Sequence, residues 1–247
     1  MHTYTPKNHY LEKKTILVTG AGDGIGKQAA LHYAKYGATV ILLGKTVAKL
    51  ESVYDQIIKN GGNEPAIVPL DLKGATAKHY RDMASTIGDQ FGCLDGLLHN
   101  ASVLGHLGPF AQISEQDWQN IMQVNVTSQF LMTQALLTIL KKSSHSSVIF
   151  TTSSVGLNGR AYWGPYAISK FATQGMMQIL ADEYENSHMR FNCINPGATK
   201  TAMRAKAFPA ENADNLKTPD QIMPLYLYLM DYQTSTENGK TFEAQPK

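Results

Sequence analysis

Short apolar runs alternate with longer amphipathic segments along this chain of 247 residues. Strands that are apolar on both faces and are separated by helices are typical of a parallel sheet covered on both sides. We therefore expect a doubly wound α/β fold, the Rossmann fold, with three α/β/α layers in a single domain over residues 14–247. Residues 1–13 are an N-terminal extension in this interpretation. The apolar runs are TILVTG (15–20), ATVILLG (38–44), EPAIVPLDL (64–72), LDGLLHNAS (94–102), SSVIFTTS (146–153) and RFNCINPG (190–197).

The composition argues against several classes of function. Hydrophobic residues make up 43% of the chain, the formal net charge is +2, and no block of Lys or Arg indicates a nucleic-acid or membrane surface. Cys93 and Cys193 are far apart, and the eight histidines lack metal-ligand spacing, so we expect no disulfide framework and no metal site. No apolar run approaches the roughly 18 residues of a membrane span, and the N-terminus lacks the apolar core of a signal peptide. We expect a cytoplasmic protein that acts on a small molecule.

The sequence TGAGDGIG (19–26) stands between the first expected strand and the first expected helix. Glycines allow tight turns there, and the helix N-terminus offers unpaired N–H groups and a partial positive charge to a pyrophosphate. Gly20, Gly24 and Gly26 have the spacing that we expect at a dinucleotide site. The plain Gly-x-Gly-x-x-Gly pattern fails, because Ile25 stands at its third glycine position. The alternative is a glycine-rich turn that serves packing alone.

The end of the second strand indicates which dinucleotide binds. A protein that selects NAD(H) places Asp or Glu there to accept from the ribose 2′-hydroxyl, whereas this chain has Gly44-Lys45. A cation favours a 2′-phosphate, so we expect NADP(H) rather than NAD(H). The alternative is that Lys45 is an ordinary surface lysine, and Asp23 in the glycine loop adds an unfavourable negative charge.

The stretch TTSSVGLNGRAYWGPYAISK contains a possible proton-transfer pair. Tyr166 stands four residues before Lys170 and would share a helix face with it, so the ammonium would lower the pKa of the phenol from about 10 toward working pH. Tyr10 and Lys14 have the same spacing, but they precede the first strand. We favour Tyr166, because its helix begins at the carboxyl edge of the sheet, where ligands bind in such folds. Ser153 ends the fifth strand and is near enough in the chain to present its hydroxyl to the Tyr166 phenol.

From about Thr15 to about Phe242 the chain resembles the short-chain dehydrogenase/reductases. The motifs that carry the resemblance are TGAGDGIG, HNAS (99–102), VNVTSQF (124–130), Ser153 followed by Val155-Gly156, YAISK (166–170) and NPGATKT (195–201). Each motif is short, but their order at the expected strand ends is specific. More narrowly, GMMQILADEY and KTPDQIMPLYLYLM resemble the bacterial YciK-type oxidoreductases.

The resemblance implies a role for each matching residue. Tyr166 would be the general acid/base, and Lys170 would lower its pKa and hold the nicotinamide ribose. Ser153, rather than Ser154, would bind the substrate oxygen, and Asn125 would bend its helix and hold a water that relays protons. The remaining matches would contact the cofactor; they are Gly20, Gly24, Ile25, Gly26, Asp71, Leu72, Asn100, Ala101, Pro196, Gly197 and Thr201.

Three positions depart from the pattern of the family. Gly22 stands where the family usually has Ser, and Ser102 stands where it has Gly. The C-terminal GKTFEAQPK lacks the usual Asp-Gly-Gly after its last strand. Gly22 removes a local hydroxyl contact without obvious harm, Ser102 puts the backbone position beside the cofactor in question, and the missing Asp-Gly-Gly puts the C-terminal edge and any tetramer contact there in question.

The resemblance also places a substrate lid at about residues 202–218. Arg204 and Lys206 in this segment would either meet an anionic substrate or be solvated, and we favour solvation. The helices expected at about 114–142 and 165–186 carry more apolar residues than one sheet face covers, which predicts a homodimer or homotetramer.

These features together predict an NADP(H)-dependent oxidoreductase that interconverts a carbonyl and a secondary alcohol. One alternative is a dinucleotide-binding sensor or scaffold without turnover, which has no need for Ser153, Tyr166, Lys170 and Asn125 together. Another is epimerisation or dehydration on the same fold, which the glycine spacing makes the weaker choice. The sequence does not indicate the physiological substrate or the preferred direction of the reaction.

Overall fold

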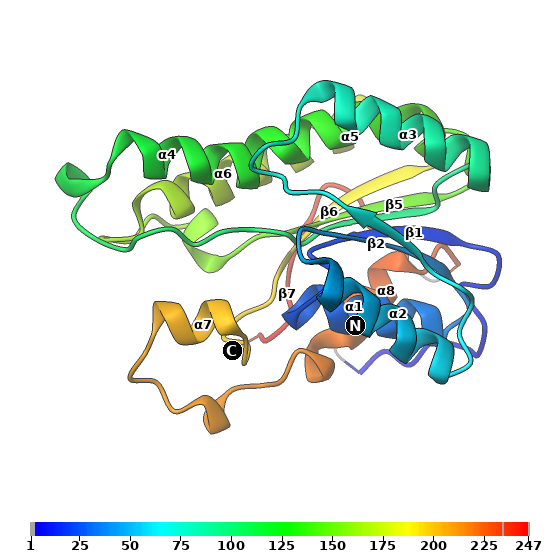
Figure 1. Cartoon of the computed structure of the whole chain (residues 1–247), viewed down its shortest axis with the longest axis horizontal. Coiled ribbons are helices and arrows are strands. Elements are labelled where there is room, and N and C mark those ends of the chain that lie inside the picture. The colour runs from blue at the N-terminus through cyan, green and yellow to red at the C-terminus, as the bar shows by residue number, and fades with distance from the viewer. Residues whose placement is uncertain (1–2, 234, 247) are drawn as a thin grey trace.

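A parallel sheet of seven strands runs through the computed structural model, which describes residues 3–233 and 235–246 (Figure 1). The strand order is β3-β2-β1-β4-β5-β6-β7, and every neighbouring pair is parallel. The predicted doubly wound α/β fold is therefore confirmed. The strands are β1 (Thr15–Thr19), β2 (Thr39–Gly44), β3 (Ala66–Pro69), β4 (Gly96–His99), β5 (Ser146–Thr151), β6 (Met189–Asn195) and β7 (Thr241–Glu243).

Helices cover both faces of this sheet. Helices α1, α2 and α8 lie on one face, and α3, α5 and α6 lie on the other (Figure 1). Strands β1, β4 and β5 are buried along their whole length, which explains why they are apolar on both sides. The helices are α1 (Gly24–Lys35), α2 (Val47–Lys59), α3 (Ala77–Phe91), α4 (Glu115–Met122), α5 (Ser128–Leu140), α6 (Gly164–Glu183), α7 (Ala202–Ala207) and α8 (Met223–Met230).

The long helix expected at about 114–142 is divided in the structure. Helix α4 is followed by a π-helical turn at Gln123–Thr127 and then by α5. Such turns place one extra residue in the helix, and they occur often at functional sites. Asn125 lies at the centre of this turn.

The order of the strands positions the site. The chain passes outward from β1 to β2 and β3, and then returns to place β4 on the other side of β1. Loops that leave the carboxyl ends of β1 and β4 therefore diverge, and a crevice between such loops is where ligands bind in this type of sheet. The strand β7 lies within the C-terminal GKTFEAQPK and is not among the six apolar runs of the sequence; it pairs with the end of β6 through Cys193 and Thr241.

The N-terminal extension packs against the folded unit. Leu11 is buried in the core beside α8, and the Tyr10 hydroxyl donates to the Leu227 carbonyl at 3.0 Å. Within residues 3–233 and 235–246, none of the helices combines the length and apolar character that a bilayer crossing requires.

Candidate active site

The turn from β1 to α1 leaves almost no room for side chains. Gly20 and Gly24 have φ angles of 67° and 53°, in the left-handed region that favours glycine. A Cβ on Gly26 would lie 2.3 Å from the carbonyl oxygen of Gly20 and 2.7 Å from Nδ2 of Asn100. The loop is thus a cradle that side chains would fill. This shape fits the pyrophosphate of a dinucleotide at the N-terminus of α1.

Asp23 caps the first helix and is held by a lysine. One carboxylate oxygen accepts from the Gly24 backbone N–H at 2.8 Å, and the other accepts from Lys49 Nζ at 2.5 Å. The hydrogen bond from Lys49 holds the pKa of Asp23 below its usual value. A Cβ on Gly22 would lie 2.9 Å from Cβ of Lys49, so Lys49 occupies the space next to this glycine. The sequence indicated that the negative charge of Asp23 is unfavourable for a pyrophosphate, but in the structure Lys49 pairs with this charge.

The ends of β1 and β4 are tied together by one hydroxyl. Thr19 Oγ1 accepts from the backbone N–H groups of Asn100 and Ala101, at 2.9 Å and 3.0 Å. The same oxygen donates to the Leu98 carbonyl at 3.2 Å. These bonds fix the predicted cofactor residues Asn100 and Ala101 beside the glycine loop.

Helix α6 and the end of β5 bring together three of the predicted catalytic side chains. The Ser153 side chain lies near the Tyr166 phenol and acts to lower its pKa, and Lys170 Nζ lies 5.5 Å from the centre of the Tyr166 ring. Lys170 Nζ also donates to the Thr151 carbonyl at 2.9 Å, which ties α6 to β5. Tyr166 and Lys170 are 7% and 1% exposed. The arrangement can move a proton within a largely water-free environment.

The expected effect of Lys170 on Tyr166 is wrong for this structure. Burial raises the pKa of Tyr166 to about 12, against the lowering effect of the Ser153 side chain. Burial also lowers the pKa of Lys170 itself to about 8. Desolvation disfavours the charged form of each group, and four-residue spacing on a helix contains no information about burial. The phenol is therefore protonated at neutral pH.

Asn125 connects the π-helical turn to the helix that carries Tyr166. Its Oδ1 accepts from the Val103 N–H, and its Nδ2 donates to the Val103 carbonyl, both at 2.9 Å. Nδ2 also donates to Ser169 Oγ at 3.0 Å, and Ser169 Oγ donates to the Tyr166 carbonyl at 2.7 Å. Asn125 is fully buried. Its amide thus holds α6 in place relative to the loop after β4.

A family model described as short chain dehydrogenase matches residues 14–212, most of the chain. The chain belongs to the short-chain dehydrogenase family. It is 53% identical over 246 residues to the YciK oxidoreductase of Escherichia coli K12, covering 100% of this chain and 97% of that protein. It is an oxidoreductase of this family, as the motifs predicted.

Two solved structures of short chain dehydrogenases resemble the chain closely. One, from Shigella flexneri 2a, was crystallised in complex with NADP; it is 52% identical, has a TM-score of 0.95, and the match covers 97% of this chain and all of that one. The other, from Escherichia coli CFT073, was crystallised with NADPH; it is 53% identical, also with a TM-score of 0.95, over 98% of this chain and all of that one.

The other predicted cofactor residues of this short-chain dehydrogenase follow the carboxyl ends of the strands. Lys45 is exposed directly after β2, and Asp71 is exposed shortly after β3. Thr201 caps α7 by accepting from the Arg204 N–H at 3.2 Å, and a Cβ on Gly24 would lie 3.5 Å from its methyl group. A hollow of about 390 Å³ lies between the glycine loop and α7. The half-buried Ile25, the buried Leu72, and Pro196 and Gly197 after β6 complete the set.

Two residues contact the predicted site residues, although the sequence patterns did not indicate either of them. Lys49 pairs with Asp23, and no short motif signals that contact. Gln245, after β7, donates through Nε2 to the carbonyls of Pro196 and Ala198, at 2.9 Å and 3.0 Å. The C-terminal segment that lacks Asp-Gly-Gly therefore supports the loop after β6 by another route.

Residues 202–218, which the sequence predicted as a substrate lid, contain an ion pair of their own. Arg204 donates from Nε and Nη2 to the two carboxylate oxygens of Glu211, at 2.6 Å and 2.5 Å. Its guanidinium lies 3.8 Å from the centre of the Phe208 ring. The expected solvation is thus wrong for Arg204, whose charge is paired within this segment, whereas Lys206 is exposed as expected.

His99, at the end of β4, has a packing role in the structure. It is buried, its ring stacks on Phe150 with centres 4.8 Å apart, and its Nε2 is 2.8 Å from Thr133 Oγ1. Burial lowers its pKa to about 3. Among the residues that the structure describes, no group of three or more His, Cys, Asp or Glu side chains is placed to hold a metal ion.

Proposed function

We propose that this protein is an NADP(H)-dependent oxidoreductase that interconverts a carbonyl and a secondary alcohol. The observation that carries the proposal is the grouping of Ser153, Tyr166 and Lys170 at the carboxyl edge of the sheet, beside the glycine cradle. A phenol with a hydroxyl and a lysine as neighbours is suited to proton transfer at a substrate oxygen. The test that decides the proposal is the loss of turnover on replacing Tyr166.

Each residue of this group has a distinct part in the proposed reaction. Tyr166 donates its phenolic proton to the carbonyl oxygen during reduction and removes the proton from the alcohol during oxidation. Ser153 binds the same substrate oxygen, and Lys170 would hold the nicotinamide ribose. When bound, the nicotinamide supplies or accepts the hydride with its two electrons. Asn125 holds α6 in place, and its part in a proton relay through water stays a prediction.

NADP(H) is the cofactor that we propose. Lys45 follows β2 where the ribose 2′ position is expected, and the two similar structures contain NADP and NADPH. The glycine cradle, Asp71, Leu72, Asn100, Ala101, Thr201 and the loop at Pro196 and Gly197 would hold the rest of the dinucleotide.

Two lysines should affect cofactor binding differently. Lys45→Gln is expected to weaken NADPH binding about tenfold and to leave NADH binding unchanged, because only NADPH has a 2′-phosphate. Lys49→Gln should weaken both about two- to fivefold, since the Asp23 carboxylate then lies unpaired at the pyrophosphate end of α1. Fluorescence titration with each dinucleotide measures both effects. Lys59→Gln, at the far end of α2, is the control. Equal losses of NADPH and NADH affinity in Lys45→Gln would contradict the proposed 2′-phosphate contact.

The two directions of the reaction should respond differently to pH. A pKa of about 12 keeps the Tyr166 phenol protonated near neutrality, so reduction has its acid ready, whereas oxidation needs the scarce phenolate. As long as the pH is below that pKa, each unit of increase in pH raises the fraction of phenolate about tenfold. Between about pH 6 and 7.5, kcat/KM for alcohol oxidation should therefore rise about tenfold per unit while ketone reduction stays nearly constant. Initial rates in both directions test this, and parallel profiles would argue against Tyr166 as the titrating group.

Residues 202–218 are proposed as the substrate lid. Helix α7, whose N-cap Thr201 lies beside the glycine loop, stands apart from the layers of the sheet (Figure 1). Phe208 meets Trp163 of the loop before Tyr166, with ring centres 5.7 Å apart. A segment that touches both the cofactor loop and the catalytic helix is suited to close over a bound substrate.

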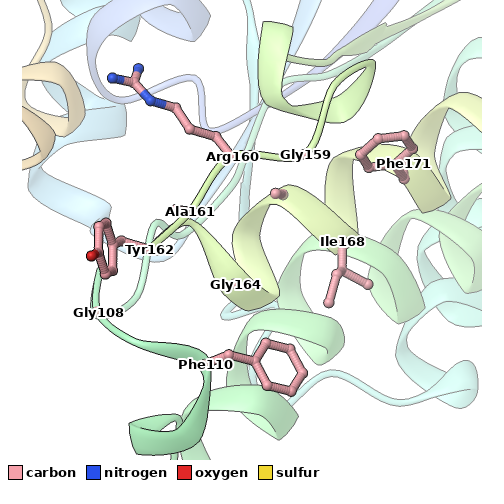
Figure 2. A pocket seen from close by; sticks show the side chains of 10 residues that line it. Gly108, Phe110, Gly159, Arg160, Ala161, Tyr162, Gly164, Ile168 and Phe171 are labelled. Carbon is pink, nitrogen blue, oxygen red and sulfur yellow. The ribbon is translucent and has the colours of Figure 1, made fainter.

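We also propose that the protein is a homodimer or homotetramer. Ile168, Phe171 and Ile179 on α6 are 36%, 44% and 59% exposed and lie along one stripe of the helix, and Phe130 of α5 is 49% exposed. Figure 2 shows the end of this stripe, where Ile168 and Phe171 line a hollow together with Phe110. Exposed apolar stripes of this kind often mark subunit interfaces. Analytical ultracentrifugation tests this, and a monomer at micromolar concentration would contradict it. The cytoplasmic location stays a prediction from the sequence.

A further inference from the structure

Apart from the Ser153 side chain and the Lys170 ammonium, the neighbours of the Tyr166 ring are apolar. Tyr166 belongs to a small buried cluster that is separate from the two large cores. Its neighbours come from the loop after β4, the turn after β5, the start of α6, and α7. We call them the apolar wall; they are Leu104, Leu107, Val155, Trp163, Met203 and Ala207.

Trp163 is the largest member of the apolar wall and connects its two sides. Its ring centre lies 6.0 Å from that of Tyr166 and 5.7 Å from that of Phe208 in the lid, and the rings are tilted by 52° and 40°. Aromatic side chains at such distances make favourable contacts. A flat apolar group that entered beside Tyr166 would pack on Trp163 in place of Phe208, so one aromatic contact would replace another.

Lys170 Nζ, 5.5 Å from the centre of the Tyr166 ring, donates to the Thr151 carbonyl, and under the proposed function it holds the nicotinamide ribose. Two cations on the α7 side of the wall are paired with carboxylates. Arg204 makes its two hydrogen bonds with Glu211, and its guanidinium lies over Phe208. Lys200 Nζ donates to Asp214 at 2.8 Å. An anionic substrate that recruited Arg204 would have to break the bidentate pair, and it would then lie close to the freed carboxylate of Glu211. Such a rearrangement is costly when the charges are partly removed from water.

We propose that the substrate of this site is an uncharged ketone or secondary alcohol whose carbonyl carbon carries a ring-sized apolar group, which packs on Trp163 within the apolar wall. This inference rests on the proposed function, because it assumes that Tyr166 is the acid that meets the carbonyl oxygen. Burying a carboxylate against these side chains without a free cation is unfavourable, whereas the ketone oxygen has the hydroxyls of Ser153 and Tyr166 as partners. The site therefore selects against a substrate whose ring carries an anionic group.

A binding experiment with a matched pair of ketones tests the inference without turnover. Methyl 4-acetylbenzoate and 4-acetylbenzoate share one scaffold and differ in charge. Trp118 and Trp163 are the two tryptophans of the chain, so Trp118→Phe leaves Trp163 as the reporter of binding. With saturating NADP⁺, the neutral ester should quench the fluorescence of Trp163 with a Kd at least about tenfold lower than that of the carboxylate.

A substitution in the wall should reverse this preference. Met203→Lys places a free cation among the apolar side chains, and it is expected to shift the ratio of the two Kd values toward the carboxylate by at least about tenfold. Lys206→Gln removes an exposed cation of the same helix and should leave the ratio unchanged. Binding of NADP⁺ itself, measured for every variant, shows that each protein is folded.

The inference is overturned if 4-acetylbenzoate binds to the Trp118→Phe protein as tightly as the ester, or if neither ketone alters the fluorescence of Trp163 while NADP⁺ binds normally. It is also overturned if Lys206→Gln, and not Met203→Lys, changes the preference. Failure of the proposed function gives a different result. In that case the ester binds with the expected preference, but either NADPH is not consumed or it is consumed at the same rate by the Tyr166→Phe protein.

Discussion

Replacing Tyr166 with phenylalanine is expected to lower kcat for ketone reduction by about 10²–10⁴-fold, the usual contribution of a general acid. The substitution removes only the phenolic oxygen, so the ring can keep its packing in the apolar wall. Binding of NADPH should therefore stay within about twofold of the parent protein, because the ring contributes bulk rather than a polar contact to that site. Stopped-flow oxidation of NADPH with a neutral aryl ketone measures the rate, and fluorescence titration measures the affinity.

Tyr162→Phe is the matched control for this experiment. Tyr162 lies four residues before Tyr166 and is 64% exposed, at the edge of the hollow in Figure 2. Its loss of a hydroxyl should leave kcat unchanged. Full turnover in Tyr166→Phe would contradict the proposed reaction. A protein that binds NADPH but reduces no carbonyl before any substitution would favour the sensor or scaffold alternative.

Gly26→Ala should damage the cofactor site more than any other single methyl group added to the glycine loop. The new Cβ would lie 2.3 Å from the Gly20 carbonyl oxygen and 2.7 Å from Asn100 Nδ2, so the loop and the end of β4 must separate. Overpacking of this kind lowers the free energy of unfolding by about 1–3 kcal/mol. The affinity for NADPH should fall at least about tenfold, because the displaced backbone is the part that would face the pyrophosphate.

Thermal unfolding and NADPH titration measure these two effects. Gly74→Ala is the control, because a Cβ at Gly74 meets no atom within 4 Å and lies outside the proposed site. It should leave both the melting temperature and the affinity unchanged. Normal NADPH binding in Gly26→Ala would show that the loop does not form the cofactor cradle.

Most of the fold could be predicted because its signals are local. Each apolar run of strand length, and the spacing of the glycines at 20, 24 and 26, involves residues that are close together in the sequence. The handedness of strand-helix-strand connections then leaves few ways to arrange the elements. The exceptions have physical reasons. The strand β7 spans only Thr241–Glu243, too short for a pattern of its own. The family resemblance indicated a bend at Asn125 but not a π-helical turn at Gln123–Thr127.

The grouping of the candidate site residues could also be predicted from the sequence, for a related reason. Parallel strands end at one edge, so Ser153 after β5 and Tyr166 at the start of α6 had to lie near the glycine loop. Their proposed roles still await the experiments above. Lys49 and Gln245 could not be found in this way, because each meets its partner across the fold without a motif of its own.

The sequence by itself determined the order of strands and helices, the family, and the edge at which Ser153, Tyr166 and Lys170 lie, because periodicity and glycine spacing act between near neighbours. Only the tertiary structure decided the charges and the solvent exposure at that edge. Burial raises the pKa of Tyr166 to about 12. Lys49 pairs with Asp23, and Glu211 pairs with Arg204. Burial and pairing depend on which groups pack together after folding, and the spacing of residues along the chain does not specify them.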